Sequence, residues 1–322
     1  MIYKEISGRL GNQMFQYAAV RSIYEKSSVK GKLVFNFQKG VLDRGFEDEL
    51  KYFKVLKYDN NGKYKSNIFQ KILLSIFNFS EKFVTLFCLI LKKDMEFAKY
   101  KYEKKFSNFL SKFGIYFVRQ GYVKFNNFNA KDKFLLGYFE SAKYFDDIRD
   151  ILLEEFTPKK APLTKNNNLY NYINSGESVC ITIRRGDFVS NPVFKKNHYI
   201  CTPNYFVNAM KIMKKKVKGA RFVVFSDDVE WCRENIKFPG EVMFESGEDP
   251  VWEKLRLMYS CKHFIISNST FSWWAQYLSR NDKKVVIAPS RWRNGGYSED
   301  IYMNDWLIYD IDNNCLVGEN NG

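Results

Sequence analysis

The sequence predicts an α/β protein of two domains, and three observations lead to this class. The chain has 322 residues, 45% of them hydrophobic, which is long for one α/β domain and enough for two. In the second half, short apolar runs alternate with helical patterns, as in a parallel sheet covered by helices on both faces. A stretch from Thr157 to Asn168, with prolines and polar residues, interrupts the pattern. We therefore expect domains at residues 1–157 and 158–322.

The first half opens with one recognisable α/β unit. The opening MIYKEI has the pattern of a short strand. It is followed by a polar loop at residues 7–12 and then by a helical pattern with its apolar side chains on one face. We expect strands at 1–6, 32–37 and 134–138, and helices at 14–24 and 142–155. Residues 57–133 are aromatic, basic and weakly patterned, and we expect helices there without assigning their limits.

The second half has a clearer periodicity. Asp249 before Pro250 favours a helix start, and Phe271, Trp274 and Leu278 recur at helical spacing. We expect strands at 179–183, 221–225, 263–266 and 284–288, and helices at 203–217, 249–261 and 271–278. In such parallel sheets, ligands bind beyond the carboxyl ends of the strands.

The composition limits the partners and the compartment. A formal net charge of +15 implies a polyanionic partner, which could be nucleic acid, an anionic membrane or a phosphorylated substrate. The six cysteines form no CxxC pair, so we expect free thiols in a reducing compartment. Only two histidines occur, far apart at His198 and His263, which argues against a histidine-based metal site.

No targeting or membrane-spanning segment is expected. The N-terminus lacks the basic-then-apolar pattern of a signal peptide. The longest apolar stretch, residues 68–91, is interrupted by Lys71, Glu81 and Lys82, whereas a spanning helix needs about 20 apolar residues. We therefore expect a cytoplasmic protein.

Two adjacent arginines follow the apolar run at residues 179–183. Arg184 and Arg185 are costly to bury without an anion, and guanidinium groups bind phosphate oxygens bidentately. Gly186 would allow a close backbone turn before Asp187. The alternative is a solvated surface turn with an Arg–Asp ion pair.

Two aspartates follow the run at residues 221–225. Asp227 would lie near a ribose hydroxyl or a base, and Trp231 follows one turn later. The alternative is that Ser226, Asp227 and Asp228 only cap the next helix, and both roles can hold together.

A string of hydroxyl residues links the run at residues 263–266 to the next helix. The first amides of a helix lack intrahelical partners and carry the positive end of its dipole. With Ser269, Thr270 and Ser272, they would form an anion site. The alternative is a well-capped helix with Trp273 and Trp274 in the core.

Together, the arginines and the hydroxyl-rich helix start describe a diphosphate site without a metal. No GxxxxGK[ST] motif occurs, and no GxGxxG follows the first strand. An acidic DxD motif would indicate a metal, but we expect the nearest match, Asp310-Ile311-Asp312, to form a late turn.

These motifs, taken in order, resemble the α-1,2-fucosyltransferases of glycosyltransferase family 11. The resemblance covers residues 1–25 and about 130–295. It is carried by GRLGNQMFQYA at residues 8–18, RRGDF at 184–188, FSDD at 225–228 with Trp231, CKH at 261–263, STFSWW at 269–274, and IAP at 287–289 with Arg291 and Trp292.

The resemblance implies a GT-B fold, in which two Rossmann-like domains face each other across a cleft. It implies an inverting transfer of fucose from GDP-fucose, without a metal or other cofactor, to a galactoside hydroxyl in α-1,2 linkage. The acceptor would be a glycan, a lipid-linked oligosaccharide or another surface-polysaccharide precursor. Protein O-fucosyltransferases share a related G-R-x-G-N-Q loop and an H-x-R motif.

By this likeness, Asn12 would point toward the reacting centre, and Arg184 would hold the β-phosphate and the glycosidic oxygen. Nucleotide contacts are expected from Gly11, Thr182, Arg185, Asp187, Asp227, Glu253, Ser269, Thr270, Phe271 and Ser272.

The sequence departs from the family pattern at two positions. Thr182 stands where the family usually has histidine, and Lys254, beside Glu253, stands where it often has aspartate. Both positions bear on the guanine contacts. Asp187, Asp228 and Glu253 are candidate bases, and the sequence does not choose among them.

Three other functions stay open. A different sugar nucleotide could serve as donor, or the chain could bind a sugar nucleotide without catalysis. A nucleic-acid-binding protein would suit Lys214-Lys215-Lys216, but it would leave the strand-end motifs unexplained, so we expect no nucleic-acid partner. The net charge also predicts that the region around residues 68–133 docks on anionic lipid, at the inner face of the membrane.

Overall fold

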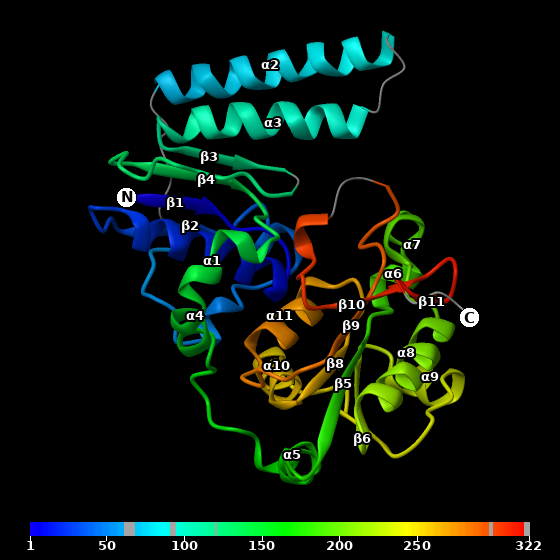
Figure 1. The fold of residues 1–322 in the computed structure, drawn as a ribbon. Coiled ribbons are helices and arrows are strands. Elements are labelled where there is room, and N and C mark those ends of the chain that lie inside the picture. Colours follow the sequence, from blue (N-terminus) through cyan, green and yellow to red (C-terminus); the bar gives the residue numbers. More distant parts are fainter. Residues whose placement is uncertain (61–67, 91–94, 120, 296–298, 319–322) are drawn as a thin grey trace. The chain divides into compact units, whose positions relative to one another are not determined.

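The structure, a computed structural model, describes residues 1–60, 68–90, 95–119, 121–295 and 299–318. The chain divides into two compact units (Figure 1). The first comprises residues 1–51 and 55–155 together with 299–302, and the second comprises residues 52–54, 156–295 and 303–318. The main crossing lies between Glu155 and Phe156. Each unit is built on a parallel sheet, so the predicted α/β class with two Rossmann-like units is confirmed.

The N-terminal unit contains a four-stranded parallel sheet in the order β2-β1-β4-β3. Its strands are β1 (Ile2–Glu5), β2 (Leu33–Asn36), β3 (Ile115–Val118) and β4 (Lys133–Gly137). The chain runs outward from β1 to β2, crosses to β3 at the opposite edge of the sheet, and then returns inward to β4 beside β1. The loop after β1 therefore lies where the strand order reverses.

The helices of this unit differ in part from those predicted. They are α1 (Leu10–Lys26), α2 (Ile68–Ile90), α3 (Met95–Ser111) and α4 (Arg149–Glu155). Short 3-10 turns lie at Leu42–Arg44, Leu50–Tyr52, Ala142–Tyr144 and Asp146–Ile148. The single helix predicted at 142–155 is thus wrong in its first half, because Phe145 takes a non-helical backbone between the two turns.

Helix α2 is apolar on two opposite faces. Its inner face packs against α3 and β3, where Leu73 and Phe77 meet Leu110, Ile115 and Phe117. We call its exposed face the outer stripe of α2. The outer stripe consists of Ile68, Phe69, Ile72, Ile76, Phe79, Phe83, Leu86, Phe87 and Ile90. Among the described residues, no helix combines the length and the apolar character needed to cross a membrane.

The C-terminal unit contains a seven-stranded sheet in the order β11-β10-β9-β8-β5-β6-β7, parallel except for β11. Its strands are β5 (Glu177–Ile183), β6 (Ala220–Ser226), β7 (Val242–Phe244), β8 (His263–Ile265), β9 (Val286–Pro289), β10 (Leu307–Asp310) and β11 (Cys315–Leu316). The four strands predicted for this half are confirmed as β5, β6, β8 and β9.

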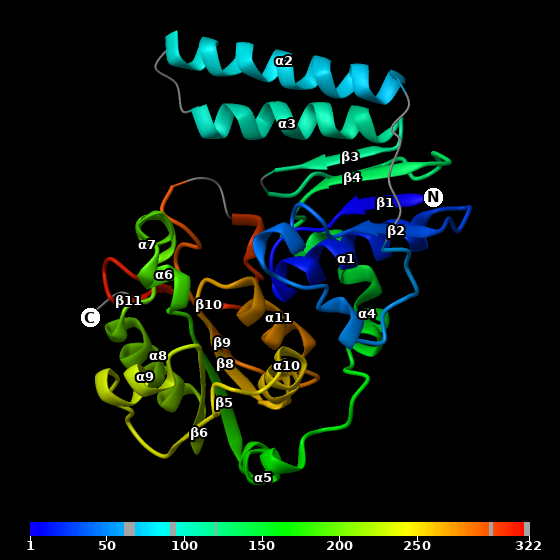
Figure 2. The ribbon, with the colours of Figure 1, turned by 180° about the vertical axis from the view of Figure 1, so that it is seen from behind.

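The helices of the C-terminal unit connect these strands. They are α5 (Asn167–Asn174), α6 (Gly186–Ser190), α7 (Pro192–His198), α8 (Pro203–Lys216), α9 (Val229–Asn235), α10 (Val251–Ser260) and α11 (Thr270–Leu278). Figures 1 and 2 show α8 and α9 on one face of the sheet and α10 and α11 on the other. This is the doubly covered parallel sheet that the alternating pattern predicted.

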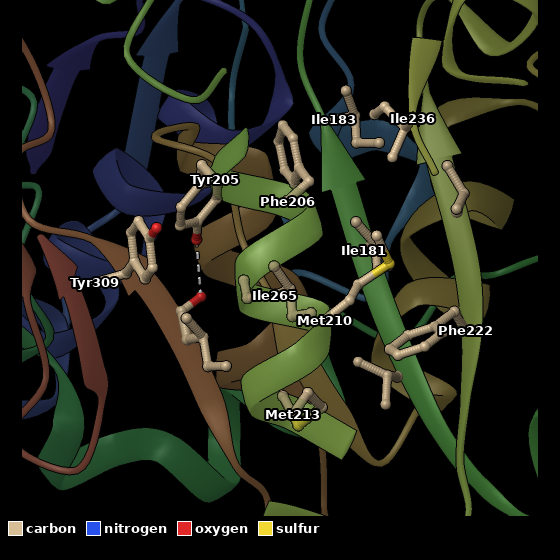
Figure 3. Close-up of a cluster of buried hydrophobic side chains, with 14 of the residues drawn as sticks. Ile181, Ile183, Tyr205, Phe206, Met210, Met213, Phe222, Ile236, Ile265 and Tyr309 are labelled. Carbon is tan, nitrogen blue, oxygen red and sulfur yellow. Dashed lines mark hydrogen bonds between the residues drawn. The ribbon is translucent and has the colours of Figure 1, made fainter. Parts of the chain in front are cut away.

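The core of this unit fixes the sheet against α8 (Figure 3). Met210 and Met213 of α8 pack with Ile181 of β5 and Phe222 of β6, and all four side chains are fully buried. The hydroxyl of Tyr205 donates a 2.7 Å hydrogen bond to the carbonyl of Ile266 just beyond β8. That bond satisfies a buried polar group and holds the end of β8 in place.

The strand order reverses between β5 and β8. From β5 the chain builds outward through β6 to β7, and then crosses back to place β8 on the other side of β5. In open α/β sheets, the carboxyl ends of the strands at such a reversal frame the ligand site. In this unit, those ends are Ile183 of β5 and Ile265 of β8.

Candidate active site

The arginine motif and the hydroxyl-rich helix start lie at the same edge of the sheet. Strands β5 and β8 are neighbours, with Ile181 paired to Ile265. The hydroxyl of Thr182 accepts a 3.1 Å hydrogen bond from the backbone amide of Ser267. This bond joins the two strands beyond their last ladder pair. It brings Arg184, two residues further on, and the start of α11 to the reversal point of the sheet.

Arg184 is held by carboxylates from two strand ends. Its Nη2 donates a 2.6 Å hydrogen bond to Asp187, and its Nη1 donates to Asp227. A Cβ on Gly186 would lie 2.5 Å from Asp227 Oδ2, so any side chain at this position would displace that carboxylate. Gly186 is the first residue of α6, and its lack of a side chain leaves room for the Asp227 carboxylate that holds the Arg184 guanidinium.

Arg185 is fixed by the second aspartate. Its Nε donates a 2.9 Å hydrogen bond to Asp228, while Asp227 accepts a 2.8 Å hydrogen bond from the Arg185 amide. The guanidinium lies over the ring of Trp231, with its central carbon 3.4 Å from the ring centroid. Asp228 also accepts from the Trp231 amide at the start of α9, so it has both the capping role and an ion pair.

The start of α11 has the features of an anion site. Ser269 is its N-cap residue, but the Ser269 side chain accepts no capping hydrogen bond. The side chains of Ser269, Thr270 and Phe271 are half-buried. Ser272 is buried, with its hydroxyl 3.2 Å from that of Ser267. Because the first amides of a helix lack intrahelical partners, this turn presents positive backbone groups at the sheet edge.

Asn268 ties two further loops to this edge. Its buried side-chain amide donates 2.9 Å hydrogen bonds to the carbonyl oxygens of His198 and Trp292. The amide of Asn294 donates a 2.8 Å hydrogen bond to Asn197. The loop after β9 and the end of α7 therefore surround the start of α11.

His198 packs beside the arginine motif. Its ring stacks on Phe188, with 5.2 Å between the ring centroids. Burial and the nearby charge of Arg293 lower the pKa of His198, while Asp187 opposes this shift. Arg293 thus adds a third guanidinium to this part of the sheet edge.

Glu253 points into the protein. Its fully buried carboxylate accepts hydrogen bonds from the Leu163 amide at 2.9 Å and from Tyr170 at 3.1 Å, and it pairs with Arg256 at 2.9 Å. Asn166 donates to the same oxygen as Leu163. In this arrangement, Glu253 holds residues 163–170 against α10. Its assignment as a guanine contact stays a prediction, and it is the least accessible of the three candidate bases.

Asp249 does not cap α10 as predicted. The cap residue is Pro250, and the buried carboxylate of Asp249 instead pairs with Lys165 at 2.7 Å and accepts from Asn166 at 2.7 Å. Asp249 therefore joins the segment before α5 to the segment before α10.

The loop after β1 in the N-terminal unit is held by two buried glutamines. Gln16 accepts from the amide of Ser7 and donates to its carbonyl, and Gln13 donates a 3.0 Å hydrogen bond to the carbonyl of Gly8. Gly8 has a positive φ of 81°, and a Cβ there would lie 2.6 Å from the Asn12 side chain. The loop fixes Gly11 and Asn12 at the first turn of α1, beside the reversal point of that sheet.

The amino-acid sequence matches glycosyl transferase family 11 over residues 1–310. The chain belongs to this family. It is therefore a glycosyltransferase, as the ordered motifs predicted.

Relatives of the family 11 chain include two from Escherichia coli. An α-1,2-colitosyltransferase is 30% identical over 301 residues, which cover 91% of this chain and 92% of the relative. The O-antigen biosynthesis glycosyltransferase WbnK is 28% identical, with 95% of this chain and 99% of the relative covered. A galactoside α-(1,2)-fucosyltransferase 1 from Leontopithecus chrysomelas is 30% identical over 158 residues, 46% of this chain and 43% of the relative.

Among solved structures, the fucosyltransferase NodZ from Bradyrhizobium matches 85% of this chain and 91% of its own at 12% identity. Its TM-score of 0.46 is too low to bear on the activity.

For this family 11 protein, the structure brings most of the predicted donor-site residues to one sheet edge. Thr182, Arg184, Arg185, Asp187, Asp227 and residues 269–272 gather there. Gly11 and Asn12 belong to the other unit, and their approach to this site across a cleft stays a prediction.

Asp310 accepts from the amides of Asp312 and Asn313, so the predicted late turn is confirmed. In the described ranges, no group of three or more His, Cys, Asp or Glu side chains is arranged to bind a metal ion.

His198, Asn268 and Arg293 are the residues that the sequence did not single out for this site. Asn268 stood inside the hydroxyl string, but its role depends on carbonyl groups 24 and 70 residues away. The Asn191-Pro192 pair predicts the start of α7, which carries His198, because asparagine caps helices and proline suits their first position.

Proposed function

We propose that this family 11 enzyme transfers fucose from GDP-fucose to the 2-hydroxyl of a galactoside, with inversion and without a metal ion. The likeness to a galactoside α-(1,2)-fucosyltransferase supports the sugar and the linkage. The likeness to an O-antigen biosynthesis glycosyltransferase supports a surface-polysaccharide precursor as acceptor. The six free thiols support a location in the cytoplasm, where thiols stay reduced.

One observation carries this proposal: Arg184 and the start of α11 share the reversal point of the parallel sheet. In the transfer, the acceptor oxygen bonds to C1 of the sugar, and the bond from C1 to the β-phosphate oxygen breaks. The bonding electrons leave with GDP, and the acceptor proton passes to a base. Guanidinium and amide groups that face the departing diphosphate stabilise the transition state more than the ground state.

Three carboxylates also lie at this edge, those of Asp187, Asp227 and Asp228. Their negative charge would repel a diphosphate if it were not paired. Each of them accepts a hydrogen bond from Arg184 or Arg185. We propose that they orient the guanidinium groups, so that little reorganisation is needed when the diphosphate binds. A divalent cation is then not required, because positive charge reaches the diphosphate from Arg184, Arg185 and the first amides of α11.

The decisive experiment combines product analysis with one substitution. The enzyme is incubated with GDP-fucose and a panel of β-galactosides in EDTA, and the linkage of the product is determined. We expect an α-1,2-fucosyl product, and about a 100-fold or greater loss of turnover in Arg184→Ala. The control is Arg221→Ala, at the opposite end of β6, where Arg221 pairs with Glu241. Near-normal turnover in Arg184→Ala, or a requirement for added metal, would contradict the proposal.

Colitose is a specific alternative to fucose as the transferred sugar. A relative that covers 91% of this chain is an α-1,2-colitosyltransferase, and colitose lacks the 3-hydroxyl of fucose. A site that hydrogen-bonds the 3-hydroxyl should reject the deoxy sugar strongly, whereas an apolar site should discriminate little. The ratio of kcat/KM for GDP-fucose and GDP-colitose decides between the two donors.

A further inference from the structure

The outer stripe of α2 is a large apolar surface that the proposed transfer does not use. Its nine side chains range from 50% exposed at Ile72 to 77% at Ile68. They recur every three or four residues along all 23 residues of α2, so they form one continuous band. Such a band on a soluble protein marks an interaction site.

The opposite face of α2 is already occupied, so this helix is held firmly. Phe77 stacks on Tyr102 of α3 and contacts Phe117 of β3, with centroid distances of 5.8 and 4.8 Å. These contacts use the inner face of α2 and leave the outer stripe exposed. Figures 1 and 2 both show α2 as the outermost helix of its unit.

The aromatic surface continues from α2 onto α3. Phe69 of the outer stripe contacts Phe113 at 5.2 Å, and Phe113 contacts Phe109 of α3 at 5.3 Å. Phe109 is 44% exposed. Lys101 and Lys105 precede it by eight and four residues and share its face of α3.

Positive charge borders this apolar surface. Lys71 and Lys82 are eleven positions apart on α2 and lie on the same flank of the outer stripe. Where side chains are described on α2 and α3, the exposed charged ones are Lys71, Lys82, Lys101 and Lys105, and the acidic Glu103 is buried.

We propose that the outer stripe of α2 inserts into the surface of an anionic phospholipid membrane, with α2 lying in the plane of that surface. A helix with an apolar face and basic flanks binds at the boundary between headgroups and acyl chains. Lysines near an anionic surface add an electrostatic attraction. The charge pattern favours lipid over a second copy of the chain, because an isologous contact would bring these lysines together.

Vesicle sedimentation of the full chain tests this proposal without any nucleotide, so its outcome is independent of the transferase reaction. Wild-type protein should pellet with vesicles of phosphatidylcholine and phosphatidylglycerol, and much less with phosphatidylcholine alone. The triple variant Phe79→Gln, Phe83→Gln, Phe87→Gln should bind the anionic vesicles at least about tenfold more weakly. Replacement of Lys71, Lys82, Lys101 and Lys105 by glutamine should weaken binding by at least about tenfold as well.

The matched control replaces three exposed apolar residues elsewhere, Val29, Leu42 and Val317, by glutamine. It should bind vesicles as the wild type does. Circular dichroism and the thermal midpoint show whether each variant is folded. Failure of wild-type protein to pellet with anionic vesicles would overturn the proposal, as would equal binding by a folded phenylalanine variant. A dimer that the phenylalanine variant disperses, without vesicle binding, would assign the stripe to self-association instead.

Discussion

The hydroxyl of Thr182 accepts a hydrogen bond from the backbone amide of Ser267, with 3.1 Å between the two atoms. Thr182 is the next-to-last residue of β5, and Ser267 lies two residues beyond β8. Both are buried. The bond therefore satisfies a buried amide and fixes the separation between the arginine motif and the start of α11.

Thr182→Val should lower the free energy of unfolding by about 1–3 kcal/mol, because the Ser267 amide would stay buried without an acceptor. Thr182→Ser keeps the hydroxyl and should lose much less. Urea unfolding measures both changes, and a GDP thermal shift on the folded variants measures the effect on the site. Equal stability of the valine and serine variants would show that the hydrogen bond matters little.

Asp227→Asn should reduce kcat/KM by about 10- to 100-fold while the protein stays folded. The carboxylate anchors Arg184 through one oxygen and the Arg185 amide through the other, so its loss should allow the guanidinium to move. Steady-state kinetics with the donor measures this loss. Asp282→Asn, at an exposed position, is the control and should leave kcat/KM unchanged. Unaltered kinetics in Asp227→Asn would contradict the orienting role.

Glu253→Ala should lower the free energy of unfolding by about 3–5 kcal/mol, because the largely buried Arg256 loses the carboxylate with which it pairs. Glu253→Gln keeps an acceptor for the Leu163 amide and should cost less. Glu230 is a close control, since it has the same three-residue spacing to Arg233 but is 84% exposed. Glu230→Ala should therefore change the unfolding free energy by less than about 1 kcal/mol.

The two glutamate variants should be compared by urea denaturation at one pH. A folded Glu253→Gln protein also tests the prediction that Glu253 contacts the guanine of the donor. The measurement is the thermal shift with GDP, UDP and ADP. Lost preference for GDP at unchanged stability would give Glu253 a nucleotide contact. Lower stability with preserved preference would give it the packing role that its contacts indicate.

Local sequence patterns predicted the strands that carry the site, because buried parallel strands read as continuous apolar runs. They could not predict that β8 lies beside β5, since the order of strands depends on long-range packing. The adjacency of Arg184 and Asp227 shows the same limit. Both motifs were visible, but the pairing of Ile183 with Ser226 that brings them together was not.

Elements set by distant contacts were missed. Helix α1 begins at Leu10, four residues before the apolar pattern, because Glu49 accepts from the Leu10 amide and Gln13 donates to the carbonyl of Glu47. Strand β3 was not predicted, because the aromatic and basic residues around it obscure a run of four buried residues. The outer stripe of α2 was part of a region expected to bind lipid, but only the structure separates its exposed apolar face from its packed one.

Stability should fall as the pH rises from about 4.5 to about 7 because of Glu49. Burial raises the pKa of Glu49 to about 7, against the opposing effect of the Leu10 amide. Between these pH values, the unfolded chain has released the proton that folded Glu49 keeps. The folded state therefore binds more protons, and the free energy of unfolding decreases with pH.

Glu49→Gln should remove a decline on the order of 2 kcal/mol while keeping an acceptor for the Leu10 amide. The exposed Glu230 is the control, because its charge does not act on Glu49, and Glu230→Gln should keep the wild-type slope. Urea unfolding at intervals from pH 4.5 to 7.5 measures the slope, and equal slopes in wild type and Glu49→Gln would show that this carboxyl titrates normally.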